Sequence, residues 1–242
     1  MSTSPTSYQL DIAADSAQLA RRCAERIAAC IDLALDERDR AHIALSGGST
    51  PAAAYRLLNQ EHLPWSRVDV VLGDERWVAA TDPESNARML RETLLAAGGP
   101  GSAACFHPVP TDLDSPQAGV DAFERHVQQL CPGDPPCFDL VLLGLGDDGH
   151  TASLFPGTAA TQEQRRLVTI GSGKGLDRIS LTAPVLSAAR QVIVLVSGAA
   201  KRQALQRLLD PMESAERTPA KLVRPRSPVW VLADAAATEG LG

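Results

Sequence analysis

The residues of this sequence that could take part in catalysis or ligand binding lie immediately after short apolar segments. One such segment, Phe138–Leu143, leads into Gly144-Leu145-Gly146-Asp147-Asp148-Gly149-His150. This pattern predicts a helix that begins at His150, and the positive end of a helix dipole disfavours a charged imidazolium. A neutral histidine at that place could act as a general base. The other four histidines have no comparable setting, so we expect structural or surface roles for them.

A glycine-rich loop follows Ala41–Leu45, with the sequence Ser46-Gly47-Gly48-Ser49-Thr50-Pro51. Two glycines allow close approach of a ligand to the backbone, and Pro51 suits a first helical position. Backbone N–H groups at such a helix start bind phosphate. The loop alone supports an anion site and a plain strand-to-helix turn about equally.

Charged residues follow two further apolar segments. After Val68–Leu72 come Asp74, Glu75 and Arg76, which places two carboxylates and one planar guanidinium at the rim of a predicted sheet. After Gln191–Val196 comes Lys201, in the first turn of a predicted helix, where a cation is unfavourable unless an anion neutralises it. Each feature taken singly could also be a solvated charge.

These segments alternate with helical patterns along most of the chain. Predicted strands cover Tyr8–Ala14, Ala41–Leu45, Val68–Leu72, Phe138–Leu143, Gln191–Val196 and Val229–Leu232. Predicted helices cover Asp15–Asp36, Pro51–Asn59, Glu84–Ala97, Gln117–Gln129 and Ala199–Leu209, while Gly98–Pro110 and Pro132–Pro136 are predicted loops. We expect a doubly wound α/β fold over residues 1–242, a single domain with a mostly parallel, Rossmann-like sheet and helices on both faces. Ligands of such sheets bind beyond the carboxyl ends of the strands.

Composition excludes several classes of function. The formal net charge of −6, without a long basic run, argues against nucleic acid as a partner. No apolar run approaches the ~20 residues that span a bilayer. Five cysteines without a Cys-x-x-Cys pair argue against a disulfide framework and against a zinc site, so we expect a cytoplasmic protein without a metal.

Taken together, these blocks resemble the 6-phosphogluconolactonase family of the oxidative pentose phosphate pathway, which is related in fold to the glucosamine-6-phosphate deaminases. The matching blocks are Ser46–Pro51, Asp74–Arg76, Ser85-Asn86, Gly144–Pro156, Arg178–Thr182 and Gly198–Lys201. The deaminase branch typically reads Ala-Phe-Asn-Glu-Pro where this chain has Ser153-Leu154-Phe155-Pro156, so the carboxylate that would partner the histidine is missing here. This difference favours the lactonase.

The resemblance implies hydrolysis of a sugar-phosphate lactone, with His150 activating water and Asp148 supporting or orienting it. Gly47, Gly48, Arg76 and Lys201 would line the phosphate end of the site. The expected substrate-binding residues are Ser46, Gly47, Gly48, Ser49, Thr50, Asp74, Arg76, Asn86, Arg178 and Lys201. The loop Thr81–Asn86 departs from the family pattern, which leaves the role of Asn86 open, and Arg178 or loop N–H groups could stabilise the oxyanion.

The expected partner is therefore a small sugar-phosphate lactone, bound by a monomer or weak homodimer, with no metal and no organic cofactor. A sugar-phosphate isomerase or deaminase that uses Asp74 or Glu75 to abstract a proton is the alternative enzyme. A sugar-phosphate sensor domain is a further alternative, which the acidic charge and the absence of a helix-turn-helix before Tyr8 disfavour.

Overall fold

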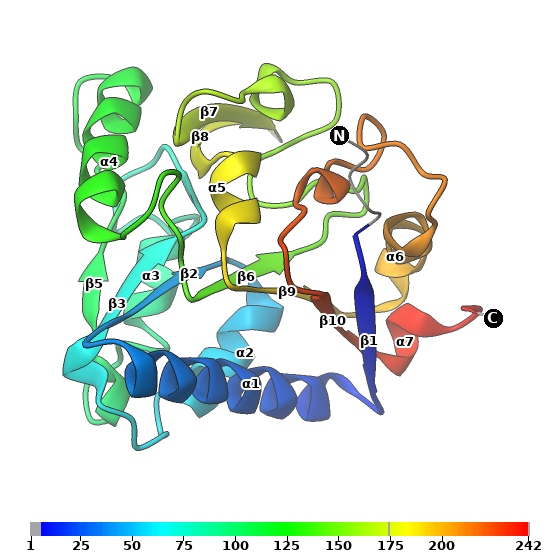
Figure 1. Cartoon of the computed structure of the whole chain (residues 1–242), viewed down its shortest axis with the longest axis horizontal. Helices are drawn as coiled ribbons and strands as arrows, with labels where there is room; N and C mark the ends of the chain where they lie inside the picture. Colours follow the sequence, from blue (N-terminus) through cyan, green and yellow to red (C-terminus); the bar gives the residue numbers. More distant parts are fainter. Residues whose placement is uncertain (1–5, 174, 242) are drawn as a thin grey trace.

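A seven-stranded parallel sheet forms the centre of the protein in the computed structural model, which describes residues 6–173 and 175–241 (Figure 1). Its strand order is β1-β10-β9-β6-β2-β3-β5. The bounds are β1 Tyr8–Ala13, β2 Ala41–Leu45, β3 Val68–Leu72, β5 Cys105–His107, β6 Leu140–Gly144, β9 Gln191–Val196 and β10 Val229–Asp234. The predicted α/β class and the mostly parallel sheet are confirmed.

A second, three-stranded antiparallel sheet was not predicted. It has the order β4-β8-β7, with bounds β4 Asp74–Arg76, β7 Val168–Gly173 and β8 Leu176–Leu181. The short strand β4 follows β3 after the single residue Gly73, so the two sheets are joined where strand β3 ends. This junction carries the charged segment Asp74–Arg76.

Helices cover both faces of the large sheet. Their bounds are α1 Ser16–Glu37, α2 Ser49–Leu58, α3 Asn86–Arg91, α4 Pro116–Leu130, α5 Ala183–Ala188, α6 Arg202–Leu209 and α7 Ala235–Thr238. Short 3₁₀ helices are η1 Trp65–Arg67, η2 Pro100–Ala103, η3 Ala159–Gln162, η4 Ala199–Lys201 and η5 Pro219–Leu222. Helices α1 and α2 lie together on one side of the large sheet, and α5 and the small sheet lie on the other (Figure 1).

The amphipathic pattern of α1 explains its position. The side chain of Asp15 caps its first turn by accepting the N–H of Gln18, at 2.7 Å. Its buried residues recur every three or four positions and include Leu19, Cys23, Ile27 and Ile31. Side chains from both sheets share one hydrophobic core, which includes the four apolar residues of β3. No helix of the described chain is both long and apolar enough to cross a membrane.

Several predicted bounds differ from the structure by one to three residues, and two predicted segments differ more. The helix expected over Glu84–Ala97 is limited to Asn86–Arg91, because Ser85 caps it by accepting the N–H of Arg88 and the chain then continues in turns. The segment expected to be a loop, Gly98–Pro110, contains η2 and the edge strand β5. An edge strand of three residues is too short to show a periodic pattern.

Candidate active site

A polar cleft opens beyond the carboxyl ends of β2, β6 and β9, where ligands of parallel sheets bind. The lining residues come from six separate segments of the chain. They are Ser46, Gly47, Asp74, Arg76, Asn86, Gly144, Leu145, Gly146, His150, Ala152, Arg178 and Lys201.

The glycine-rich loop joins β2 to α2 and lies at one wall of the cleft. Gly48 has a φ of 111°, which favours glycine, and it precedes α2 without a side-chain cap. The N–H groups of the first turn are therefore available to a ligand. Ser46 is held through its backbone, because its N–H donates to the Tyr55 hydroxyl, which donates in turn to the Ser46 carbonyl.

Not every residue of this loop reaches the cleft. Ser46 and Gly47 line it, whereas Ser49 and Thr50 line a neighbouring shallow depression together with Ser197. Gly48 contributes as the N-cap position of α2. The expected roles of Gly48, Ser49 and Thr50 in substrate binding stay predictions.

Two arginines lie side by side on neighbouring strands of the small sheet. Arg76 on β4 and Arg178 on β8 are direct partners in the antiparallel register, and both line the cleft. Burial lowers the pKa of Arg178, and the positive charge of Arg76 acts in the same direction. Within the described residues, the Nε atoms of both arginines are buried without a hydrogen-bond partner. Two convergent guanidinium groups form a place for an anion.

Asp74 lies beside this pair and is fixed by its neighbours. The Ser153 hydroxyl donates to its Oδ2 at 2.6 Å, and the Arg178 Nη1 lies 3.7 Å from the same oxygen. Ser153 is fully buried, and its own N–H donates to the Ser180 hydroxyl on β8. This support could not be predicted from local patterns, because Ser153 and β8 are distant in the chain from Asp74.

Glu75 is not at the rim, which corrects the expectation that two carboxylates project there. It is 2 % exposed, and burial raises the pKa of its carboxyl group. Its two oxygens accept the backbone N–H groups of Arg76, Asn86 and Ala87 and the Ser85 hydroxyl. In strand β4, alternate residues point to opposite sides, so Asp74 and Arg76 face the cleft and Glu75 faces the start of α3.

Asn86, whose role the sequence left open, does reach the cleft. It is the first residue of α3, and its Nδ2 donates to the Asp74 carbonyl at 2.9 Å. Its amide group lies against Gly47 of the glycine-rich loop.

His150 lies in a turn-rich loop, so the expectation that it begins a helix was wrong. Residues 145–158 form turns and a bridge between Thr151 and Leu154. Gly149 has a φ of 91° and Ala152 a φ of 47°, and neither value occurs inside an α-helix. A helix dipole therefore does not act on this imidazole.

Asp148 and Phe155 hold the imidazole instead. The Asp148 Oδ1 lies 2.5 Å from His150 Nδ1 and also accepts the His150 N–H at 3.0 Å. The rings of His150 and Phe155 lie 4.3 Å apart between centroids. Gly146 permits this arrangement, because a Cβ there would lie 2.0 Å from His150 Nδ1. A carboxylate on Nδ1 favours the tautomer with its proton on Nδ1, which makes Nε2 the basic nitrogen.

Lys201 is the last residue of η4 and immediately precedes α6, so the α-helix predicted to begin at Ala199 begins at Arg202 instead. The preceding loop is fixed by Asp234 at the end of β10, which accepts the Gly198 N–H and the Ser197 hydroxyl. Lys201 lines the same cleft as the two arginines. Three cations from distant parts of the chain therefore meet in one place.

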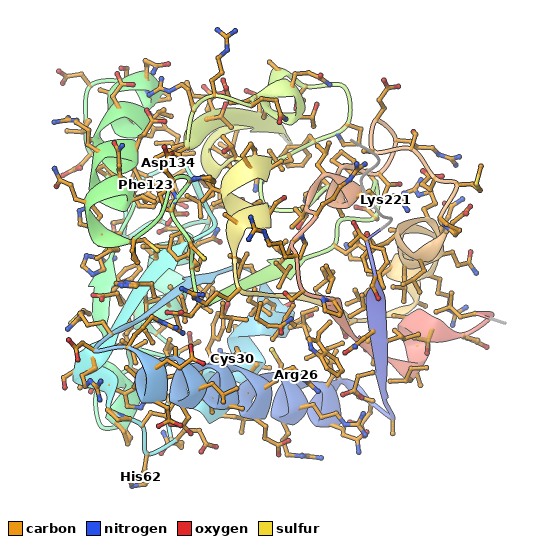
Figure 2. The ribbon with its side chains drawn as sticks, viewed as in Figure 1. Arg26, Cys30, His62, Phe123, Asp134 and Lys221 are labelled. Carbon is orange, nitrogen blue, oxygen red and sulfur yellow. The ribbon has the colours of Figure 1, made fainter. Side chains whose placement is uncertain are left out.

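The other histidines lie away from this cleft. Asp69, near the amino end of β3, contacts His107 Nε2 at 2.9 Å and His42 Nδ1 at 3.3 Å, and His107 contacts His126 at 3.0 Å. His62 is exposed in the loop after α2 and projects from the edge of the molecule (Figure 2). Over residues 6–173 and 175–241, no group of three or more His, Cys, Asp or Glu side chains could hold a metal ion.

Comparisons with known proteins agree on one family. The sequence model of the family described as glucosamine-6-phosphate isomerases/6-phosphogluconolactonase matches residues 14–232. A 6-phosphogluconolactonase of Synechocystis sp. is 39% identical over 236 residues, covering 96% of this chain and 98% of the relative. One from Nostoc sp. is 39% identical over 231 residues, covering 94% and 96%.

Solved structures show the same similarity. A 6-phosphogluconolactonase from Trypanosoma brucei superposes with a TM-score of 0.86 at 29% identity, covering 100% of both chains. One from Shewanella baltica has a TM-score of 0.84 at 30% identity, covering 95% of this chain and 98% of that chain. A monomeric glucosamine-6-phosphate deaminase, at 22% identity and a TM-score of 0.78, shares the fold.

Proposed function

The chain belongs to the glucosamine-6-phosphate isomerase/6-phosphogluconolactonase family, and from this membership we propose that it hydrolyses 6-phospho-D-glucono-1,5-lactone to 6-phospho-D-gluconate. This reaction belongs to the oxidative pentose phosphate pathway. The observation that carries the proposal is a histidine–carboxylate pair, His150 and Asp148, in the same cleft as three cations.

The cations and the glycine-rich loop hold the phosphate of the substrate. Arg76 offers a planar fork, Lys201 offers a point charge, and the start of α2 offers backbone N–H groups. A protein with a net charge of −6 needs such local donors for an anionic ligand. Asp74 lines the same cleft, and its carboxylate can accept hydrogen bonds from the hydroxyl groups of the sugar acid.

The lactone is opened by water. Nε2 of His150 takes a proton from a water molecule as its oxygen attacks C1, and a tetrahedral oxyanion forms. The bond between C1 and the ring oxygen then breaks, and the proton passes from His150 to that oxygen, which becomes the 5-hydroxyl of the product. Arg178 stabilises the oxyanion, since it lies over the Phe155 ring whose centroid is 4.3 Å from that of His150.

The position of Phe155 favours lactone hydrolysis over deamination. The aromatic ring of Phe155 packs against His150, in the segment where the deaminase branch typically carries the glutamate of Ala-Phe-Asn-Glu-Pro. Ring opening of an amino sugar by the alternative enzyme would require an acid partner for the histidine at that place. Hydrolysis of an ester requires an activated water and a held carbonyl, which the cleft offers.

The proposal also includes the cellular compartment, the domain organisation and the oligomeric state. All five cysteines of the described chain are free, which fits a reducing cytoplasm. The shared hydrophobic core of both sheets supports one domain. We infer a monomer or weak homodimer, because the proposed reaction requires no residue of a second copy.

The test is hydrolysis of freshly prepared lactone by the purified protein, followed by acid release against an enzyme-free blank. The product is identified as 6-phosphogluconate by NMR. Glucosamine 6-phosphate is supplied in parallel, and ammonia release is measured. Ammonia release without lactone hydrolysis would show that the alternative enzyme is the correct one.

A further inference from the structure

The backbone conformation of Gly47 does not explain why this residue is a glycine. Its φ lies outside the left-handed region, so an alanine could adopt the same backbone conformation. A Cβ at this position would nevertheless lie 1.9 Å from the Asn86 Oδ1 and 2.3 Å from the Asn86 Cγ. No real Cβ approaches another atom so closely. The side chain of Asn86 therefore occupies the space that a residue larger than glycine would need.

Asn86 itself cannot easily move away. It is 3 % exposed, its Nδ2 donates to the Asp74 carbonyl at 2.9 Å, and its backbone N–H donates to Glu75 at 2.8 Å. The Asn86 amide thus bridges strand β4, which carries Asp74 and Arg76 of the cleft, and the loop that precedes α2.

The side chain of Glu75 fixes the start of α3 by hydrogen bonds. Its buried carboxylate accepts four hydrogen bonds, three from backbone N–H groups and one from the Ser85 hydroxyl. Hydrogen bonds to an ionised acceptor are about twice as strong as neutral ones. A buried charge with this many donors is a rigid support for Asn86.

We propose that Asn86, held by Glu75, is a positioning residue that fixes the glycine-rich loop in its anion-binding conformation. This inference rests on the proposed function of that loop. Asn86 acts by contact with Gly47, and the loop N–H groups at the start of α2 then point at the phosphate. Misplacement of a binding group by 1 Å can cost on the order of 100-fold, so loss of this contact should be measurable.

The experiment is a double-mutant cycle with Gly47→Ala, Asn86→Ala and the double variant. The dissociation constant of 6-phosphogluconate is measured by calorimetry, together with KM and kcat for the lactone. We expect Gly47→Ala to weaken binding by roughly 100-fold and Asn86→Ala by roughly 10-fold. In the double variant the new Cβ enters the space left by the amide, so binding should match Asn86→Ala alone.

A matched control exists at the other end of α2. Asn59, also a buried asparagine, lies against Gly99, where a Cβ would meet its Nδ2 at 2.3 Å. Gly99 has a φ of −107°, which alanine tolerates. The variants Asn59→Ala, Gly99→Ala and their double variant should show the same kind of coupling in thermal stability but no change in the dissociation constant.

The outcomes separate the two proposals. The positioning role would be overturned if the dissociation constant of the double variant rose by the product of the two single effects. It would also be overturned if Asn86→Ala bound 6-phosphogluconate as tightly as the wild type. If Gly47→Ala does not fold, the comparison of Asn86→Ala with Asn59→Ala decides. A wild-type protein that binds 6-phosphogluconate without hydrolysing the lactone would overturn the proposed function and leave the cycle measurable, whereas absence of binding would overturn both.

Discussion

Replacement of Asp148 by asparagine tests how the imidazole is held. The carboxylate accepts two hydrogen bonds from His150, from the ring at 2.5 Å and from the backbone at 3.0 Å. Asparagine has the same size and keeps one acceptor oxygen, so the ring should stay in place against Phe155. The negative charge that stabilises the imidazolium during proton transfer is lost.

The expected decrease in kcat follows from the exposed fractions of the Asp148 and His150 side chains. A hydrogen bond to a charged group contributes about 1.5–3 kcal/mol in a buried setting. The Asp148 side chain is 42% exposed while that of His150 is 15% exposed, so solvent screens part of this contribution. A remaining stabilisation of about 1–2 kcal/mol corresponds to a decrease of about 5- to 30-fold in kcat.

The assay compares Asp148→Asn, Asp148→Ala and the wild type on freshly prepared lactone. Each rate is corrected for spontaneous hydrolysis with an enzyme-free blank. Asp148→Ala should lose more activity than Asp148→Asn, because it also removes the acceptor that selects the tautomer. Binding of 6-phosphogluconate should stay within a few-fold of the wild type for both variants, since neither removes a phosphate contact.

Two results would refute this reasoning. Unchanged kcat in both variants would show that Gly146 and Phe155 suffice to orient the ring. A loss as large as that from removal of His150 itself would show that the carboxylate takes part in the chemistry directly.

Other variants test the remaining assignments. His150→Asn should lower kcat by about 10²- to 10⁴-fold while the protein still binds 6-phosphogluconate, and near-native kcat would contradict the general-base role. Lys201→Ala and Arg76→Ala should mainly raise KM, and unchanged kinetics in both would exclude the proposed phosphate site. Burial lowers the pKa of His42 and His126 in the folded protein. Just below the pKa of a free histidine, each side chain is therefore neutral in the folded protein but protonated in the unfolded chain. The free energy of unfolding in urea should therefore fall as the pH drops below about 6.5, less steeply in His126→Gln, and an equally steep decline in that variant would contradict the assignment.

The central strands could be predicted because burial on both faces makes their sequences almost wholly apolar. The predicted bounds of Ala41–Leu45, Val68–Leu72 and Gln191–Val196 are those of β2, β3 and β9. Since ligands bind at the carboxyl ends of such strands, the same pattern also located Asp74, Arg76 and Lys201, which line one cleft.

The small sheet could not be predicted from local patterns. Strand β4 consists of three charged residues, and β8 begins with Leu176-Asp177-Arg178, so neither shows an apolar run. Their pairing joins residues about a hundred positions apart, with Asp74 opposite Ser180 and Arg76 opposite Arg178. Only the tertiary fold determines this register.

The loop of His150 was misinterpreted for a different reason. Small and apolar residues after Gly149 are compatible with a helix start, and the sequence does not reveal that Ala152 takes a positive φ. The contacts of Thr151 with the Gly144 carbonyl and of Gly149 with Thr218 hold the non-helical path. Local propensity was overridden by tertiary packing.

The pairing of Arg76 with Arg178 has a consequence for the folding stability of this protein. Like charges directly opposite each other on neighbouring strands oppose folding, and here both groups are also largely withdrawn from water. A neutral residue of similar length at position 76 should therefore raise the melting temperature of the free protein, whereas removal of Arg178 would take the ion-pair partner from the buried carboxylate of Asp74. An increase of this kind would show that the cleft holds an anion-binding group at a cost in folding stability, so a screen for heat-resistant variants would tend to enrich for variants with impaired ligand binding.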